Sequence, residues 1–236
     1  MDTTPRTVQA HGITLAYRVW GPPDAPPVLL LHARGHDGSD WAQTAPALAA
    51  GPRRVYAPDL RGHGRSDWPG DYRYATMADD VHAFLTALGI DRADVVGHSL
   101  GGAVACLLAQ RHPETVRRLV LEDVPAPFPL DPPRPPAERP AGDLPYDWAM
   151  ILATDRQRNA PNPVWGDHMG RITMPTLLIG GGATSLIPQE QIAALAALLP
   201  DARHLTIDAG HLVHATRPEE FLTAVDQFLT PWHPAP

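Results

Sequence analysis

The chain has 236 residues, 44% of them hydrophobic, which suits one α/β domain with a large core. Its formal net charge of −7 comes without a basic run, so we expect neither nucleic acid nor an anionic membrane as a partner. The single cysteine, Cys106, excludes an internal disulfide and a cysteine-rich metal site.

The beginning of the sequence carries no sign of export. Residues 1–6 lack the apolar segment of a signal peptide, and no hydrophobic run approaches the length of a membrane span. We therefore expect a cytoplasmic protein.

Strand and helix patterns alternate along the chain. Apolar or alternating runs predict about eight strands, at residues 7–10, 13–20, 28–31, 54–57, 93–96, 118–121, 176–179 and 204–207. Helical patterns fall at residues 41–50, 76–88, 102–109, 146–158, 165–169, 188–199 and 218–229, with Thr76 as a predicted N-cap and Gly89 as a stop signal. This alternation predicts an α/β fold with a mostly parallel, doubly wound sheet.

A proline-rich segment interrupts the alternation. Nine prolines lie between Pro125 and Pro145, a density that neither a helix nor a central strand tolerates. Phe128, Tyr146, Trp148 and Trp165 indicate a packed lid rather than a disordered linker. We therefore predict a core domain made of residues 1–124 and 171–236, with a lid at 125–170 above the carboxyl edge of the sheet, where ligands bind in such folds.

The most informative motif is Gly97-His98-Ser99-Leu100-Gly101. It joins an apolar strand to a small-residue helix, so Ser99 stands at the tip of a sharp, strained turn with its hydroxyl exposed. A serine hydroxyl needs a base, and His211, just after the last predicted strand, lies at the same sheet edge. The amide of Leu100 would supply one oxyanion donor.

Four motifs together resemble the α/β-hydrolase superfamily, in its lipase- and esterase-like serine hydrolases. They are Leu31-His32, the run from Asp59 to Asp67 (DLRGHGRSD), the run from Gly97 to Gly102, and Gly210-His211 ahead of a helix that starts at Pro218. The resemblance implies an α/β-hydrolase fold, Ser99 as the nucleophile and His211 as the general base. It also implies that the amide of Arg34, two residues after His32, is the second oxyanion donor.

The acidic member of the triad departs from the common pattern. Many relatives carry an aspartate where this chain has Thr184, and threonine holds no negative charge. Another location known in the fold, the end of the preceding strand, points to Asp123. Glu122, Asp208, or no acid at all are the alternatives.

The expected activity is hydrolysis of a small to medium, partly apolar carboxylic ester through an acyl-enzyme. Lactone, thioester or C–C bond cleavage, acyl transfer, or non-catalytic ligand binding remain open. The partner would be a small-molecule substrate, with Trp41, Trp68, Trp148 and Trp165 as candidates to line its pocket. No cofactor and no metal are expected, and His214 is expected to position a loop. Oligomeric state is left open.

Overall fold

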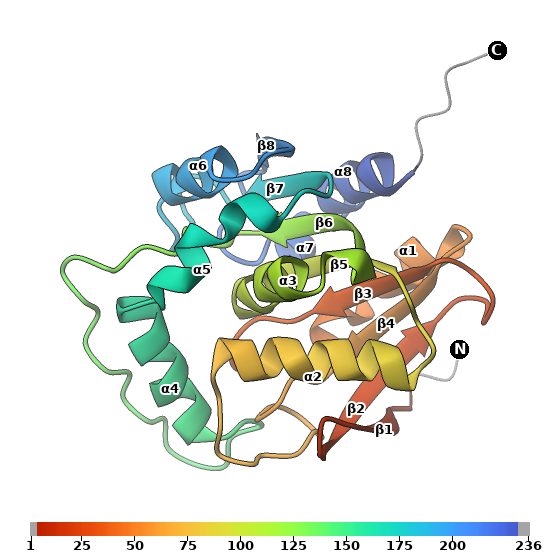
Figure 1. Cartoon of the computed structure of the whole chain (residues 1–236), viewed down its shortest axis with the longest axis horizontal. Coiled ribbons are helices and arrows are strands. Elements are labelled where there is room, and N and C mark those ends of the chain that lie inside the picture. The colour runs from red at the N-terminus through yellow and green to blue at the C-terminus, as the bar shows by residue number, and fades with distance from the viewer. Residues whose placement is uncertain (1–3, 231–236) are drawn as a thin grey trace.

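The computed structural model describes residues 4–230. Residues 1–3 and 231–236, the two ends of the predicted core domain, lie outside the described residues. The described residues form one eight-stranded sheet in the order β1-β2-β4-β3-β5-β6-β7-β8 (Figure 1). Its strands are Arg6–Ala10, Ile13–Trp20, Pro27–Leu31, Arg54–Pro58, Ala93–His98, Val116–Glu122, Thr176–Gly180 and Ala202–Thr206. The pairs β1–β2 and β2–β4 are antiparallel and the other pairs are parallel, which confirms the predicted, mostly parallel sheet.

Helices cover both faces of this sheet. The α-helices are α1 (Ala45–Ala50), α2 (Tyr74–Ala87), α3 (Leu100–Arg111), α4 (Trp148–Asn159), α5 (Pro163–Asp167), α6 (Gln189–Ala197), α7 (Val213–Thr216) and α8 (Pro218–Leu229). Short 3₁₀ turns occupy η1 (Gly38–Ala42), η2 (Pro113–Thr115) and η3 (Met169–Arg171).

Alternate residues of each central strand face the two helical layers. In β3, Leu29 and Leu31 pack into the core shared with α2, α3 and α6, whereas Val28 and Leu30 pack toward α1 and α8. All four side chains are fully buried. The continuous apolar run of β3 therefore follows from burial on both faces.

Two local predictions need correction. The helix expected at 41–50 is split into η1 and α1, because a proline, Pro46, lacks the N–H that an interior position requires and occupies the first turn of α1. The predicted N-cap of α2, Thr76, lies inside the helix and donates instead to Asp71 Oδ2 at 3.1 Å. Gly89 has a positive φ of 68° just past the end of α2, as its stop signal predicts.

The 125–170 segment runs irregularly to α4 and then forms α4, α5 and η3, which lie together at one side of the sheet (Figure 1). Trp165 is buried and meets Tyr74 of α2 edge to face, with ring centroids 6.0 Å apart. Gln110 of α3 donates to the carbonyl of Trp165 at 2.9 Å. The segment is thus packed against α2 and α3 by both apolar and polar contacts.

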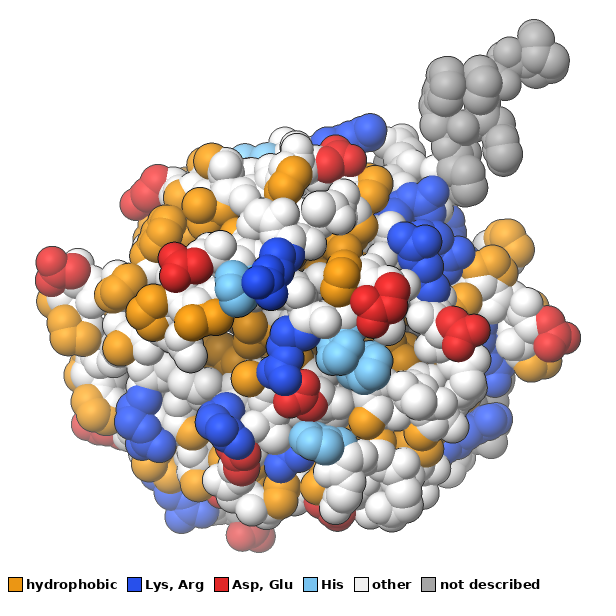
Figure 2. Space-filling model, in the orientation of Figure 1, with side chains coloured by type: hydrophobic (Ala, Val, Ile, Leu, Met, Phe, Trp, Pro, Cys, Tyr) orange, Lys and Arg blue, Asp and Glu red, His pale blue; other side chains and the backbone are white. Residues whose placement is uncertain are grey.

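Acidic and basic side chains are interspersed over the viewed face of the molecule (Figure 2). Within residues 4–230, no helix is both long enough and apolar enough to cross a membrane.

Candidate active site

Ser99 lies in the single-residue turn between β5 and α3. Its φ of 50° and ψ of −110° place a non-glycine residue in a strained conformation of the kind found at functional sites. The neighbouring glycines are required by close backbone contacts. A Cβ on Gly101 would lie 2.3 Å from the carbonyl oxygen of Leu31, and one on Gly97 would lie 2.6 Å from Gly102 Cα. The sequence motif therefore sets how closely α3 approaches the sheet.

The two amides predicted as oxyanion donors belong to Leu100 and Arg34, which line one cavity together with Ser99. The amide of Leu100 lies in the first turn of α3, where N–H groups have no partner within the helix and the helix dipole favours negative charge. The Arg34 amide belongs to the loop that follows β3, the neighbour of β5. His32 holds this loop, since its Nδ1 lies 2.8 Å from the carbonyl of Ala33 and its Nε2 accepts from the Leu60 amide at 2.9 Å.

Asp123 stands directly after β6 and is fully buried. Its Oδ2 lies 2.6 Å from His211 Nδ1, and its Oδ1 accepts from the Gly181 amide at 2.9 Å. Like Ser99, Asp123 has a positive φ, 49°, so both residues leave their strands through strained backbone. The contact orients the imidazole, because an Nδ1–H donated to the carboxylate leaves Nε2 free to accept a proton.

Ser185 was not among the predicted site residues. Its hydroxyl donates to Asp123 Oδ2 and accepts from the Ile187 amide at 2.9 Å. Ser185 follows Thr184, the position where many relatives carry their aspartate, so a hydroxyl one residue further on was the available signal. With the Gly181 amide, it gives the buried carboxylate of Asp123 two hydrogen bonds besides the one to His211.

His98 connects the Ser99 turn to the His211 loop. Its Nε2 lies 2.7 Å from the carbonyl oxygen of His211, and the two rings have centroids 4.6 Å apart. Burial lowers the pKa of His98 to about 4, so the ring is neutral and donates its Nε2–H to that carbonyl. The loop that carries His211 is therefore attached to the residue next to Ser99.

Glu122 pairs with a different histidine. Its carboxylate accepts from both the backbone amide and Nδ1 of His214, at 2.9 Å each, and all these groups are buried. Burial alone would lower the pKa of His214. The charge of Glu122 and the contact with Asp40 outweigh burial and raise this pKa to about 10. Asp208, the other alternative, packs against Gly182, where a Cβ would meet its Oδ1 at 2.0 Å.

A cavity of about 100 Å³ opens beside Ser99. Its walls are mostly apolar, with Leu100 and Ala103 from α3, Phe128 and Leu130 from the 125–170 segment, and Trp165 from α5. Among the predicted pocket residues, Trp165 is the one that lines this cavity.

The other predicted tryptophans lie elsewhere. Trp41 is fully buried and stacks on His214 with ring centroids 4.2 Å apart, so it belongs to the core on the α1 and α8 side. Trp68 is 45% exposed at the surface. Trp148 begins α4 and packs against the core on the α2 and α3 side. Tryptophan type alone did not distinguish a pocket wall from core packing.

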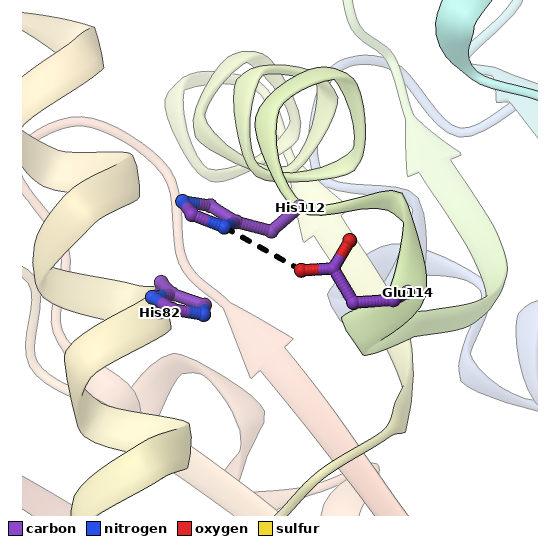
Figure 3. Close-up of side chains that lie close together, drawn as sticks. All are labelled: His82, His112 and Glu114. Carbon is purple, nitrogen blue, oxygen red and sulfur yellow. Dashed lines mark ion pairs between the residues drawn. The ribbon is translucent and has the colours of Figure 1, made fainter.

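Two groups among the described residues have metal-ligand types. In the first, His82 and His112 stack face to face at 3.7 Å and 7°, with Glu114 3.6 Å from His112 Nδ1 (Figure 3). Ring lone pairs lie in the ring planes, so parallel stacked rings do not aim at one ion. In the second, His98, Glu122 and His214, the carboxylate is already bonded to His214. Neither arrangement fits a metal without rearrangement.

A serine on a strained strand-to-helix turn, together with a histidine that contacts the preceding residue His98 and is held by a buried aspartate, is typical of the α/β-hydrolase class. The family model described as alpha/beta hydrolase fold matches residues 26–161, more than half of the sequence, and the chain belongs to this family.

Relatives of this chain match it over different fractions of its length. An uncharacterized protein of Mycobacterium tuberculosis, Rv2715, is 41% identical over 124 residues, which are 51% of this chain but only 36% of that protein. The 2-hydroxymuconate semialdehyde hydrolase of Pseudomonas putida is 30% identical over 86% of each chain. The crystal structure of a hydrolase from Pseudomonas aeruginosa matches 98% of this chain and 100% of that one, with 28% identity and a TM-score of 0.83.

Proposed function

We propose that this protein is a serine hydrolase that cleaves small to medium carboxylic esters through an acyl-enzyme. Ser99 is the nucleophile, His211 the general base, and Asp123 the acid that orients His211. The contact of 2.6 Å between His211 Nδ1 and Asp123 Oδ2, beside the strained turn of Ser99, is the observation that carries the proposal. Family membership alone would not, because the same fold hosts many functions.

The reaction proceeds in two halves. In the first, Ser99 Oγ attacks the ester carbonyl while His211 Nε2 takes the hydroxyl proton, and the resulting imidazolium returns that proton to the leaving alcohol. The amides of Leu100 and Arg34 stabilise the oxyanion of the tetrahedral intermediate. In the second half, His211 removes a proton from water, which attacks the acyl carbonyl and releases the carboxylic acid and Ser99.

The position of Asp123 supports the proposal that this residue replaces the aspartate that many relatives carry where this chain has Thr184. The carboxyl ends of β6 and β7 are adjacent in the sheet, so an acid from either can approach a histidine delivered after β8. Here β6 supplies the charge, and the loop after β7 supplies neutral donors from Gly181 and Ser185. Those donors stabilise the ionised carboxylate, which in turn stabilises the imidazolium.

The cavity supports an ester with a partly apolar acyl chain. Phe128, Leu130 and Trp165 offer apolar contacts beside Ser99, and the cavity is too small for a bulky polymer.

An active-site-directed fluorophosphonate separates an enzyme from a binding protein of the same fold. The wild-type chain should be labelled at Ser99 and should hydrolyse 4-nitrophenyl butyrate, whereas Ser99→Ala should do neither. Ser39→Ala, at an exposed serine, is the matched control and should behave as wild type. A folded wild-type chain that is neither labelled nor active on esters would contradict the proposal.

A further inference from the structure

Three arginines reach the cavity beside Ser99 from separate parts of the chain. Arg34 comes from the loop after β3, Arg134 from the irregular part of the 125–170 segment, and Arg158 from α4. The residues that line the cavity include no aspartate or glutamate. An acidic chain, with a net charge of −7, thus places positive charge at the one site where we propose chemistry.

The three guanidinium groups differ in what they contact. Arg34 forms an ion pair with Asp155 of α4, and Arg134 donates to the carbonyl of Leu186 at 3.3 Å. The side chain of Arg158 has neither a hydrogen bond nor an ion pair with any of residues 4–230. Of the three guanidinium groups, only that of Arg34 has a carboxylate partner among residues 4–230, and this partner is Asp155.

The charged form of Arg158 is electrostatically unfavourable in this position. Its side chain is half-buried, and burial together with the charges of Arg34 and Arg134 lowers its pKa below the usual value. A partly desolvated charge without a partner is unfavourable, and an anion in the cavity would relieve both the desolvation and the mutual repulsion. A planar guanidinium also matches the two oxygens of a carboxylate.

We propose that the substrate carries a carboxylate on its acyl chain and that Arg158 binds this carboxylate while the ester lies at Ser99. The inference rests on the proposed esterase function and specifies its substrate class as half-esters of dicarboxylic acids. Phe128, Leu130 and Trp165 contact the apolar methylene chain between the two ends of the substrate. Arg158 determines specificity and takes no part in the bond-breaking steps.

A matched pair of substrates tests the inference. Mono-4-nitrophenyl adipate and 4-nitrophenyl hexanoate have the same chain length and leaving group and differ in the terminal carboxylate. The wild-type chain should prefer the adipate in kcat/KM, mainly through a lower KM. Arg158→Gln should lower the adipate-to-hexanoate ratio by about 10- to 100-fold, the range expected for a hydrogen-bonded charge pair. Arg158→Lys keeps the charge but not the planar guanidinium, so it should lower the adipate-to-hexanoate ratio less than Arg158→Gln does.

Arg156→Gln is the matched control. Arg156 lies on the same helix two residues earlier, is exposed, and does not line the cavity beside Ser99. It should leave the adipate-to-hexanoate ratio of the wild type unchanged. A wild type without preference for the adipate, or equal effects of Arg156→Gln and Arg158→Gln, would overturn the inference.

A binding measurement separates this inference from the proposed function. Calorimetric titration of Ser99→Ala with adipate dianion should show binding that the additional change Arg158→Gln weakens by a similar factor. If the wild type hydrolyses no ester but Ser99→Ala binds adipate through Arg158, the anion site stands and the esterase proposal fails. If esters are hydrolysed but adipate binding is insensitive to Arg158, the anion site fails alone.

Discussion

Breaking the buried pair of Glu122 and His214 should strongly destabilise the fold next to the Ser99 turn. Glu122 ends β6 and accepts two hydrogen bonds from the first turn of α7, one from the ring of His214 and one from its amide. Replacing Glu122 by Gln keeps the size of the side chain and removes its charge. His214 then retains only Asp40, at 3.5 Å, as a charged partner.

The expected loss of folding free energy on Glu122→Gln follows from the burial of Glu122 and His214. Removing one partner of a buried ion pair costs about 3–5 kcal/mol, and we expect the lower end because glutamine can still accept one hydrogen bond. For a chain of this size, about 3 kcal/mol lowers Tm by about 6–12 °C. Glu138→Gln, an exposed change in the 125–170 segment, is the control and should leave Tm within about 1 °C.

The loss should depend on pH with a defined sign. Because the folded chain raises the pKa of His214 from 6.5 to about 10, its stabilisation is complete below pH 6.5 and is lost as pH rises toward 10. For Glu122, burial is outweighed by the neighbouring histidines, which hold its pKa below 4.5, so its contribution is present above pH 4.5 and is lost as pH falls through the lowered value. Calorimetry of both chains should show the largest Tm difference between pH 4.5 and 6.5.

Two outcomes would refute this reasoning. One is a Tm for Glu122→Gln that lies within about 2 °C of the wild type at pH 6, which would mean that the pair contributes little beyond its desolvation cost. The other is a Tm difference that stays constant from pH 6 to pH 9.5, which would mean that His214 is not the protonated partner.

Three further substitutions probe the Ser99 turn and the acid. Asp123→Asn should lower kcat by up to about 10⁴-fold while the chain still folds, because His211 loses its orientation; near-normal ester turnover would place the acid elsewhere. Ser185→Ala removes one hydrogen bond to Asp123 and should lower kcat by about tenfold, and a rate equal to wild type would show the bond to be dispensable. Gly101→Ala should destabilise the chain by about 1–3 kcal/mol in urea titration, since its Cβ would lie 2.3 Å from the Leu31 oxygen; an unchanged midpoint would contradict this contact.

The fold was predictable because its signals are local. Apolar runs such as that of β3 identify strands buried on both faces, and the alternation with helices fixes a parallel sheet. The boundary at Pro46 was harder to place, because the apolar periodicity continues through the point where η1 gives way to α1. Thr76 shows the same limit, since its capping pattern is satisfied by a hydrogen bond to Asp71 from inside α2.

For the candidate site, the sequence predicted local geometry only where the backbone shape requires particular residues. The glycines around Ser99 are such a case, because contacts near 2.5 Å admit no other residue. The tryptophans predicted to line the pocket are not such a case, because the sequence does not distinguish Trp41, which packs in the core, from Trp165, which also lines the cavity. The sequence also did not predict that the Arg158 side chain lacks a partner, because its surroundings are formed by side chains from three distant segments.

Two adjacent acids at the end of β6 each hold a different histidine. Glu122 ends the strand and Asp123 leaves it with a positive φ, so the two carboxylates contact different residues, His214 at the start of α7 and His211 in the loop before it. The two histidines are three residues apart, and the backbone between them is held at both ends. Because His98 also donates to the carbonyl of His211, the loop has three buried attachments around the Ser99 turn. The general base that we propose, His211, must keep its geometry to a fraction of an ångström, and these contacts from one strand end would supply that rigidity.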